Sequence, residues 1–152
     1  MQEKQDATPE TETVTETETV AEQKTEEETA EDGEEMMLRL WIGGEEVKVE
    51  WEENEAVSEL TEQAKKAPVT VRMDPYGGFE QVGALGFTLP SEDERIVTQP
   101  GDLMLYQADK IVAFYGSNTW AYTRLGKITD QTETELETLL GQDAVELRIA
   151  FE

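Results

Sequence analysis

The sequence predicts a mainly β domain with two short helices, preceded by an acidic tail. Its centre is the segment 99–128, where three apolar runs, 103–106, 111–115 and 121–124, are separated by short polar or glycine-containing turns. The runs are rich in β-branched and aromatic residues, as neighbouring strands are. Apolar residues recur at helical spacing in two other places, so helices should form the smaller part of the fold.

Residues 1–35 form the acidic tail. They contain 14 Asp and Glu, two Lys, no aromatic residue and a Thr-Glu alternation that offers no apolar face. Such a composition cannot bury enough surface to offset chain entropy, so we expect a disordered tail and a folded domain over 36–152. The tail is either a solvated spacer or a featureless extension.

The tail also bears on localisation. Thr/Glu-rich linkers follow the lipidated cysteine of exported bacterial lipoproteins, and residues 1–35 resemble such a linker. This favours the cell envelope or the cell exterior, as a mature lipoprotein segment, with a cytoplasmic protein as the alternative. No stretch approaches the roughly 18 apolar residues that span a bilayer, so we expect no membrane insertion.

Charge and composition limit the partners and the chemistry. The net charge is −24 over 152 residues, which repels phosphate backbones, so we expect no nucleic-acid partner and consider a basic peptide more suitable. The chain has no cysteine and no histidine, which excludes disulfides, the usual zinc sites and imidazole bases. Asp74, Asp93 and Asp102 match no calcium-loop spacing, so we expect no metal and no cofactor.

The domain should open with a hairpin and a helix. Apolar residues alternate along 38–42, the Gly-Gly pair 43–44 turns the chain, and the alternation resumes over 47–51. Asn54 can then cap a helix whose apolar residues recur at helical spacing until Pro68 prevents continuation.

The middle of the domain has one clear strand. Residues 69–73 read Val, Thr, Val, Arg and Met, which places Arg72 on the face opposite the interior. Turn residues follow, and Gly83 and Gly86 permit close backbone approach or a positive φ, which suits a barrel rim or a ligand groove. A short strand is predicted over 95–98.

The chain should end with a second helix and a last strand. Asp130 and Glu133 have the spacing of a capping box, a leucine stripe follows, and Gly141 ends the helix before the alternating strand 144–151. Side chains that alternate in the strongest strands are expected to fill the interior: Val71, Leu105, Val112, Phe114, Leu147 and Ile149.

Four separated motifs carry a family resemblance. They are YGGFEQVGALGFTLP over 76–90, PGDLMLY over 100–106, IVAFYGSNTW over 111–120 and YTRLGKI over 122–128. Together they resemble the small bacterial cyclophilin-like domain proteins over about 38–151. The resemblance implies a closed antiparallel β-barrel of about eight strands with two capping helices, and it implies no established function.

Comparison with true cyclophilins implies an altered proline pocket. Tyr122 takes the place of their pocket histidine, and Lys110 and Val112 fall near their pocket glutamine and phenylalanine. A prolyl isomerase must lower a barrier of about 18–20 kcal/mol by binding the twisted amide preferentially, with a donor such as arginine. Arg72 is the nearest match to their catalytic arginine by strand order, so it is catalytic only if the protein is an isomerase. The alternative is an exposed strand residue beside carboxylates.

The functional prediction is a noncatalytic binding module for a peptide or a small molecule, acting as a monomer. The ligand-binding candidates are Arg72, Tyr76, Phe79, Lys110, Val112 and Tyr122. Tyr76 and Phe79 lie in a predicted loop, where core packing and ligand contact are equally open. The alternative functions are a weak peptidyl-prolyl cis-trans isomerase and a structural or interaction domain without a pocket.

Overall fold

The structure, a computed structural model, describes residues 36–152, of which Leu38–Phe151 form one compact unit. The prediction of a disordered spacer over 1–35 lies outside the described residues. The elements are β1 (Leu38–Ile42), β2 (Glu45–Val47), β3 (Val49–Trp51), α1 (Glu55–Lys66), β4 (Val69–Tyr76), β5 (Glu80–Ala84), β6 (Glu94–Val97), β7 (Asp102–Tyr106), β8 (Lys110–Phe114), β9 (Thr119–Ile128), α2 (Glu133–Leu140) and β10 (Val145–Phe151).

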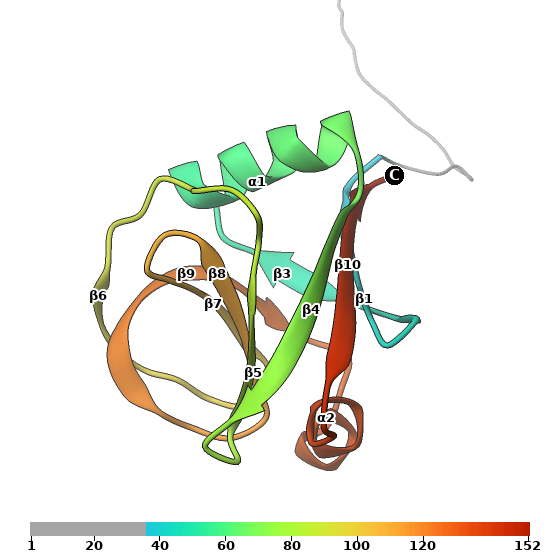
Figure 1. Cartoon of the computed structure of the whole chain (residues 1–152), viewed down its shortest axis with the longest axis vertical. Coiled ribbons are helices and arrows are strands. Elements are labelled where there is room, and N and C mark those ends of the chain that lie inside the picture. Colours follow the sequence, from blue (N-terminus) through green and yellow to red (C-terminus); the bar gives the residue numbers. More distant parts are fainter. Residues whose placement is uncertain (1–35) are drawn as a thin grey trace, which may run out of the picture. The chain divides into compact units, whose positions relative to one another are not determined.

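The strands form a nearly closed antiparallel barrel (Figure 1). The pairing order is β2-β1-β10-β4-β5-β8-β7-β9-β3, and β6 pairs with β9 outside this path. Because only Lys48 separates β2 from β3, the two ends of the sheet belong to one bent segment of chain. Counted as one strand, this segment gives a ring of eight strands, which confirms the predicted fold class.

The bend at Lys48 is held by the connection between β9 and α2. The Lys48 amide donates to Asp130 Oδ1 at 3.1 Å, and the Lys48 carbonyl accepts from the Thr129 amide at 2.9 Å. On the other side of the bend, the Trp51 indole donates to the Leu38 carbonyl at 3.0 Å. These bonds link β1, the bend and the end of β9, so they close the barrel where the sheet hydrogen bonds stop.

The same contact corrects the predicted cap of the second helix. Asp130 is engaged at the bend, and Thr132 is the N-cap of α2 instead. Thr132 Oγ1 accepts from the Glu135 amide at 3.1 Å, and Glu135 Oε1 accepts from the Thr132 amide at 2.8 Å. A capping box is therefore present two residues later than the sequence indicated.

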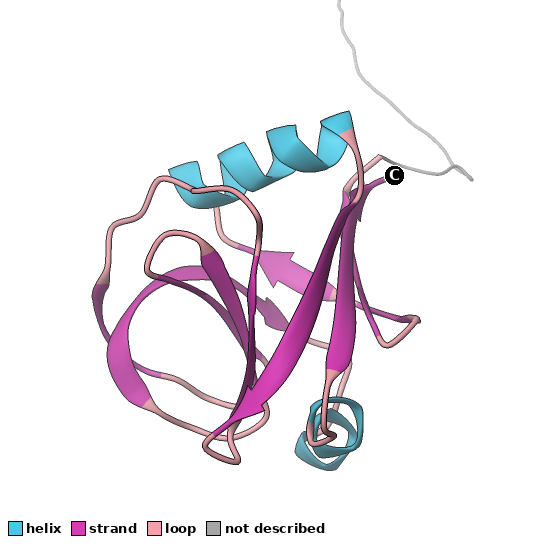
Figure 2. Cartoon of the chain, viewed as in Figure 1, coloured by secondary structure: helices cyan, strands magenta, loops and turns pink. Residues whose placement is uncertain are grey.

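The two helices lie at opposite ends of the barrel (Figures 1 and 2). The predicted cap of α1 is confirmed, since Asn54 Oδ1 accepts from the Val57 amide at 2.9 Å. Leu60 and Ala64 on the same face are buried against the core. At the other end, the buried Gln81 Nε2 donates to the Leu140 carbonyl at 2.7 Å, which ties the end of α2 to β5. No helix in the described range 36–152 is long and apolar enough to cross a membrane.

Strand β5 is the main element that the sequence did not predict. Its sequence, EQVGA, lacks a clean alternation, and β4 also continues past its predicted end to Tyr76. Gly83 lets the two strands meet closely, because a Cβ at this position would lie 2.5 Å from the Arg72 carbonyl oxygen. Gly86 has a φ of 92°. Gly83 thus permits the close backbone approach, and Gly86 has the positive φ, that the sequence indicated for this pair.

The sheet buries side chains on both faces. Inside the barrel, one cluster includes Val71, Leu105, Leu147 and Ile149, as predicted. A second, smaller cluster lies on the outer face and consists of Ile96, Met104, Val112, Phe114 and Tyr122. The interior assignment of Val112 and Phe114 was therefore wrong about the face: both are buried, but outside the barrel. Alternation cannot distinguish the two sides of a strand that is covered on both, and every residue from Ile111 to Phe114 is buried.

Candidate functional site

A pocket of about 680 Å³ opens on the outer face of the barrel, beside the second cluster. Its lining is mostly aromatic and consists of Tyr76, Gly77, Phe79, Glu80, Val82, Tyr106, Asn118, Trp120 and Tyr122. We call it the aromatic pocket. Residues from β4, β5, β7 and β9 contribute, so adjacent strands of the rigid barrel hold the walls.

The strand registers explain why these side chains meet. Tyr76 of β4 lies opposite Glu80 of β5, and Glu80 lies opposite Phe114 of β8. Directly opposite residues of antiparallel strands project from the same face of the sheet. One row of outward side chains therefore crosses these three strands, and two of its members, Tyr76 and Glu80, line the pocket.

Ring contacts organise the aromatic side chains. The Tyr76 and Phe79 rings pack edge to face at 5.9 Å between centroids. Phe114 packs edge to face against Tyr122 at 5.6 Å, and Tyr106 packs at 6.1 Å against the same ring. Such pairs contribute about 0.5–1.5 kcal/mol each beyond their burial, so Tyr122 is held firmly at the base of the aromatic pocket.

Hydrogen bonds fix two of the walls. The Phe79 carbonyl accepts from the Tyr115 and Gly116 amides, both at 3.0 Å. In another part of the lining, the Asn118 amide donates to Thr98 Oγ1 at 2.8 Å, and Asn118 Nδ2 donates to the Tyr122 hydroxyl at 3.0 Å. The pocket walls are therefore held in place by hydrogen bonds within the chain, as the walls of binding sites for small groups usually are.

Glu80 is the one charged residue that lines the aromatic pocket in the described part of the chain. Its side chain is 6% exposed, and Oε1 is buried without a hydrogen-bond partner among residues 36–152. Burial raises the pKa of Glu80 from 4.5 to about 7, because a carboxylate away from water is destabilised. Burial also raises the pKa of the Tyr122 phenol.

The site candidates fall into two groups. Tyr76, Phe79 and Tyr122 line the aromatic pocket, and Val112 belongs to the cluster with Tyr122. Arg72 does not line it: it is exposed on β4 opposite Glu146 of β10, four residues and about 13 Å along the strand from Tyr76. Lys110 also lies outside the lining, and its Nζ contacts Asp109 Oδ1 at 2.9 Å.

Glu80 was not among the sequence candidates. It directly follows Gly77, Gly78 and Phe79, where the sequence indicated a loop. A glutamate in a loop is expected to be exposed. Only the pairing of β5 with β8 places Glu80 opposite Phe114 and buries it. Trp120 and Tyr106 could be named from the sequence as possible aromatic walls, but not as neighbours of a carboxyl group.

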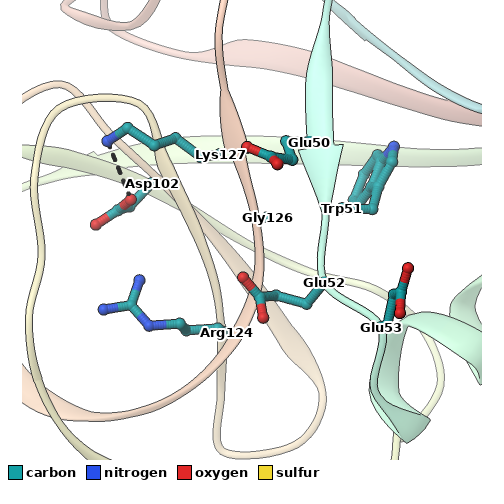
Figure 3. A pocket seen from close by; sticks show the side chains of 8 residues that line it. All are labelled: Glu50, Trp51, Glu52, Glu53, Asp102, Arg124, Gly126 and Lys127. Carbon is teal, nitrogen blue, oxygen red and sulfur yellow. Dashed lines mark hydrogen bonds and ion pairs between the residues drawn. The ribbon is translucent and has the colours of Figure 1, made fainter.

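A second pocket, of about 520 Å³, lies where β3 meets β9 (Figure 3). Its side chains are mainly charged. Lys127 Nζ contacts Asp102 Oδ1 at 3.4 Å, and Arg124 points to the same side of β9 (Figure 3). Among residues 36–152 no group of three or more Asp and Glu could hold a metal ion, so this surface offers alternating charges rather than a metal centre.

Comparisons with known proteins agree with the fold. Residues 40–152 match the Cyclophilin-like family, and the chain belongs to that family. A solution structure of the hypothetical protein AF2241 from Archaeoglobus fulgidus is similar, with a TM-score of 0.58 and 20% sequence identity, over 78% of this chain and 95% of that one. No match was found among curated proteins. The family gives the fold of the chain and brings no ligand or reaction with it.

Proposed function

We propose that the protein is a noncatalytic binding module that holds part of a peptide or a small molecule in the aromatic pocket. The observation that carries the proposal is a concave, preformed, mainly aromatic site on a rigid barrel, with one buried polar group left without a partner. Ligand sites have this composition: apolar walls that provide affinity and a few polar groups that fix orientation.

The edges of the aromatic pocket support this proposal. Trp120 is 54% exposed and Tyr76 is 62% exposed, although both are large aromatic side chains. Exposed aromatic residues beside a concave site are typical of surfaces that bury area on binding. The existence of this site favours a binding module over an interaction domain without a pocket.

Peptide binding can be tested by NMR titration. Capped tripeptides, Ac-Ala-Xaa-Ala-NH₂, with each standard amino acid at Xaa, would be added to the ¹⁵N-labelled protein. We expect at least one of these peptides to shift the amide signals of Gly77 and Asn118 together with the indole signal of Trp120. Trp120→Ala should weaken that binding by about tenfold or more, because an aromatic anchor of an interface is worth about 2 kcal/mol.

Arg124→Ala is the matched control, since Arg124 is exposed and lines the second pocket, between β3 and β9, which we call the charged pocket. This variant should bind the same peptide unchanged. Saturable shifts that cluster at Arg124 and Lys127, or the absence of any saturable shift in the aromatic pocket, would contradict the proposed function.

A further inference from the structure

We propose that the aromatic pocket recognises a cationic group, the ammonium of lysine or the guanidinium of arginine, in a basic peptide. This inference rests on the proposed function and specifies its ligand. It is carried by the combination of the buried Glu80 carboxyl group with aromatic rings from three strands and the turn before β5.

The first argument is the hydrogen-bonding state of Glu80. Oε1 is buried and accepts no hydrogen bond within residues 36–152, and its residue, Glu80, lines the open pocket. Buried polar atoms in proteins are nearly always paired, so an unpaired one needs an explanation. Lysine and arginine carry only donors, and a charge-assisted bond to a carboxylate is among the strongest that a side chain makes. A neutral apolar ligand would offer the Glu80 carboxyl group no hydrogen-bond donor.

The second argument is the nature of the walls. Tyr76, Phe79, Tyr106, Trp120 and Tyr122 all line the same pocket as Glu80. The faces of aromatic rings carry partial negative charge and attract a cation placed over them, with tryptophan giving the strongest effect. Aromatic cages of this kind bind ammonium groups, and a carboxylate among the rings adds charge complementarity. The exposed Trp120 and Tyr76 can also cover the alkyl stem of a long basic side chain.

The third argument is the sign of the surrounding charge. No lysine or arginine lines the aromatic pocket, while the domain over 36–152 contains 22 acidic and 10 basic residues. A surface with this excess attracts basic peptides and repels acidic ones before contact. An anionic ligand would meet both a carboxyl group and the negative faces of the rings, so the charge pattern opposes it.

The decisive experiment compares charged side chains with neutral ones of the same shape. Ac-Ala-Xaa-Ala-NH₂ peptides with arginine, citrulline, lysine, norleucine or glutamate at Xaa would be titrated by NMR. We expect arginine and lysine peptides to bind at least about tenfold tighter than citrulline and norleucine peptides, which corresponds to one charge-assisted bond. The glutamate peptide should bind most weakly.

Glu80→Gln removes the charge and keeps the shape of the side chain. It should abolish the preference for arginine over citrulline while leaving the weak binding of citrulline in place. Trp120→Ala should weaken the arginine peptide more than the citrulline peptide, because it removes a cation–π contact. Since Trp120 is exposed, this second variant should fold even if Glu80→Gln does not.

The pH dependence supplies an independent readout. The other titratable or charged groups on the neighbouring strands are Arg72, Asp74 and Tyr76 on β4, Glu94 and Arg95 on β6, Asp102 and Tyr106 on β7, Lys110 on β8, and Tyr122, Arg124 and Lys127 on β9. Burial raises the pKa of Tyr122 among these groups. The chain also has no histidine. With a Glu80 pKa of about 7, the arginine peptide should therefore bind about tenfold more weakly at pH 6 than at pH 8.

The outcomes separate the two proposals. Equal or tighter binding of citrulline and norleucine peptides in the aromatic pocket, unaffected by Glu80→Gln, would overturn cation recognition and leave a binding module. If no peptide shifts the NMR signals of residues in the aromatic pocket, both proposals fail together. If basic peptides bind only at Arg124 and Lys127, the pocket assignment is wrong and both proposals are again overturned.

Discussion

Glu80 is a carboxylic acid placed where its charged form is unfavourable. The unfolded chain would hold this group at its ordinary pKa of 4.5, while burial in the folded barrel raises the pKa to about 7. A raised folded pKa means that folding favours the protonated form. Stability is therefore fullest below pH 4.5, falls as the pH rises from 4.5 to 7, and stays reduced above 7 by about 3 kcal/mol.

Glu80→Gln should consequently stabilise the protein at alkaline pH. The amide carries no charge to desolvate, so the free energy of unfolding at pH 8 should rise by up to about 3 kcal/mol. The gain should shrink to near zero at pH 4. Urea unfolding at both pH values measures it, with the exposed Glu146→Gln as the control. A Glu80→Gln variant that is less stable at pH 8 would mean that the carboxylate has a stabilising partner in the folded state.

Strands β4 and β5 approach each other because residue 83 has no side chain. A Cβ on Gly83 would lie 2.5 Å from the Arg72 carbonyl oxygen and 2.6 Å from Val71 Cγ1, both closer than real contacts allow. The backbone oxygen cannot rotate away. Gly83→Ala should therefore lower the free energy of unfolding by about 1–3 kcal/mol, the usual cost of overpacking. An unchanged denaturation midpoint would show that β4 and β5 can separate without loss.

Strand β8 stabilises two different clusters from its two faces. Phe114 belongs to the outer cluster, where it supports the Tyr122 ring. Ile111 and Ala113 of the same strand belong to the barrel interior, as does Leu105 of the neighbouring β7. Phe114→Ala should cost about 3–5 kcal/mol and also displace Tyr122 from the aromatic pocket.

Leu105→Ala is the matched control for this variant. It should cost about 2–5 kcal/mol and leave the NMR signals of Trp120 and Asn118 in place. Thermal unfolding gives the stability, and the two-dimensional NMR spectrum gives the state of the aromatic pocket. Equal disturbance of the pocket by both variants would show that the outer and inner clusters respond as one unit.

Local patterns predicted the elements well where one physical rule acted alone. Asn54 caps α1 as expected, and the alternation in β10 correctly assigned Leu147 and Ile149 to the interior. Predictions failed where a distant partner decided the outcome. Asp130 was expected to cap α2, but its carboxylate accepts a hydrogen bond from the backbone amide of Lys48, far away in sequence. Phe114 is buried on the outer face because the outer cluster, which includes Ile96 of β6, covers it. Alternation along β8 cannot reveal this contact.

The candidate site was harder to predict from the sequence than the strands and helices. Aromatic residues in a predicted loop could be suggested as ligand contacts, and Tyr76, Phe79 and Tyr122 indeed share one pocket. Their common feature, the buried Glu80, depends on the pairing of β5 with its neighbours. A site that is assembled across several strands from long-range pairings can be described only once the register is known.

At the scale of the molecule, the barrel core and the proposed binding site lie on different faces of the sheet. The interior cluster fills the ring and closes it, while the aromatic pocket lies on the outer face and can vary without changing the interior. The family match gives the fold of the barrel and carries no information about the pocket on its outer face. The charged pocket at Arg124 and Lys127 provides a second outer surface on the same scaffold.

The final prediction is that this protein lacks efficient prolyl isomerase activity. Acceleration requires groups that bind the twisted amide better than the planar one, against a barrier of about 18–20 kcal/mol. Within the described chain no arginine lines the aromatic pocket, Arg72 is about 13 Å along β4 from Tyr76, and the buried acid is an acceptor when ionised. Uniform binding of a proline peptide would give affinity without acceleration.

A coupled-protease assay on a short Xaa-Pro peptide tests this, with a true cyclophilin as the positive control. We expect the rate to equal the uncatalysed background, and Arg72→Ala to change neither this rate nor peptide binding in the aromatic pocket. Arg72 lies outside the pocket, so a clear turnover that Arg72→Ala abolishes would require the substrate to bind across β4 instead. That result would make the weak isomerase the better description and move the site from the aromatic pocket to the face that carries Arg72.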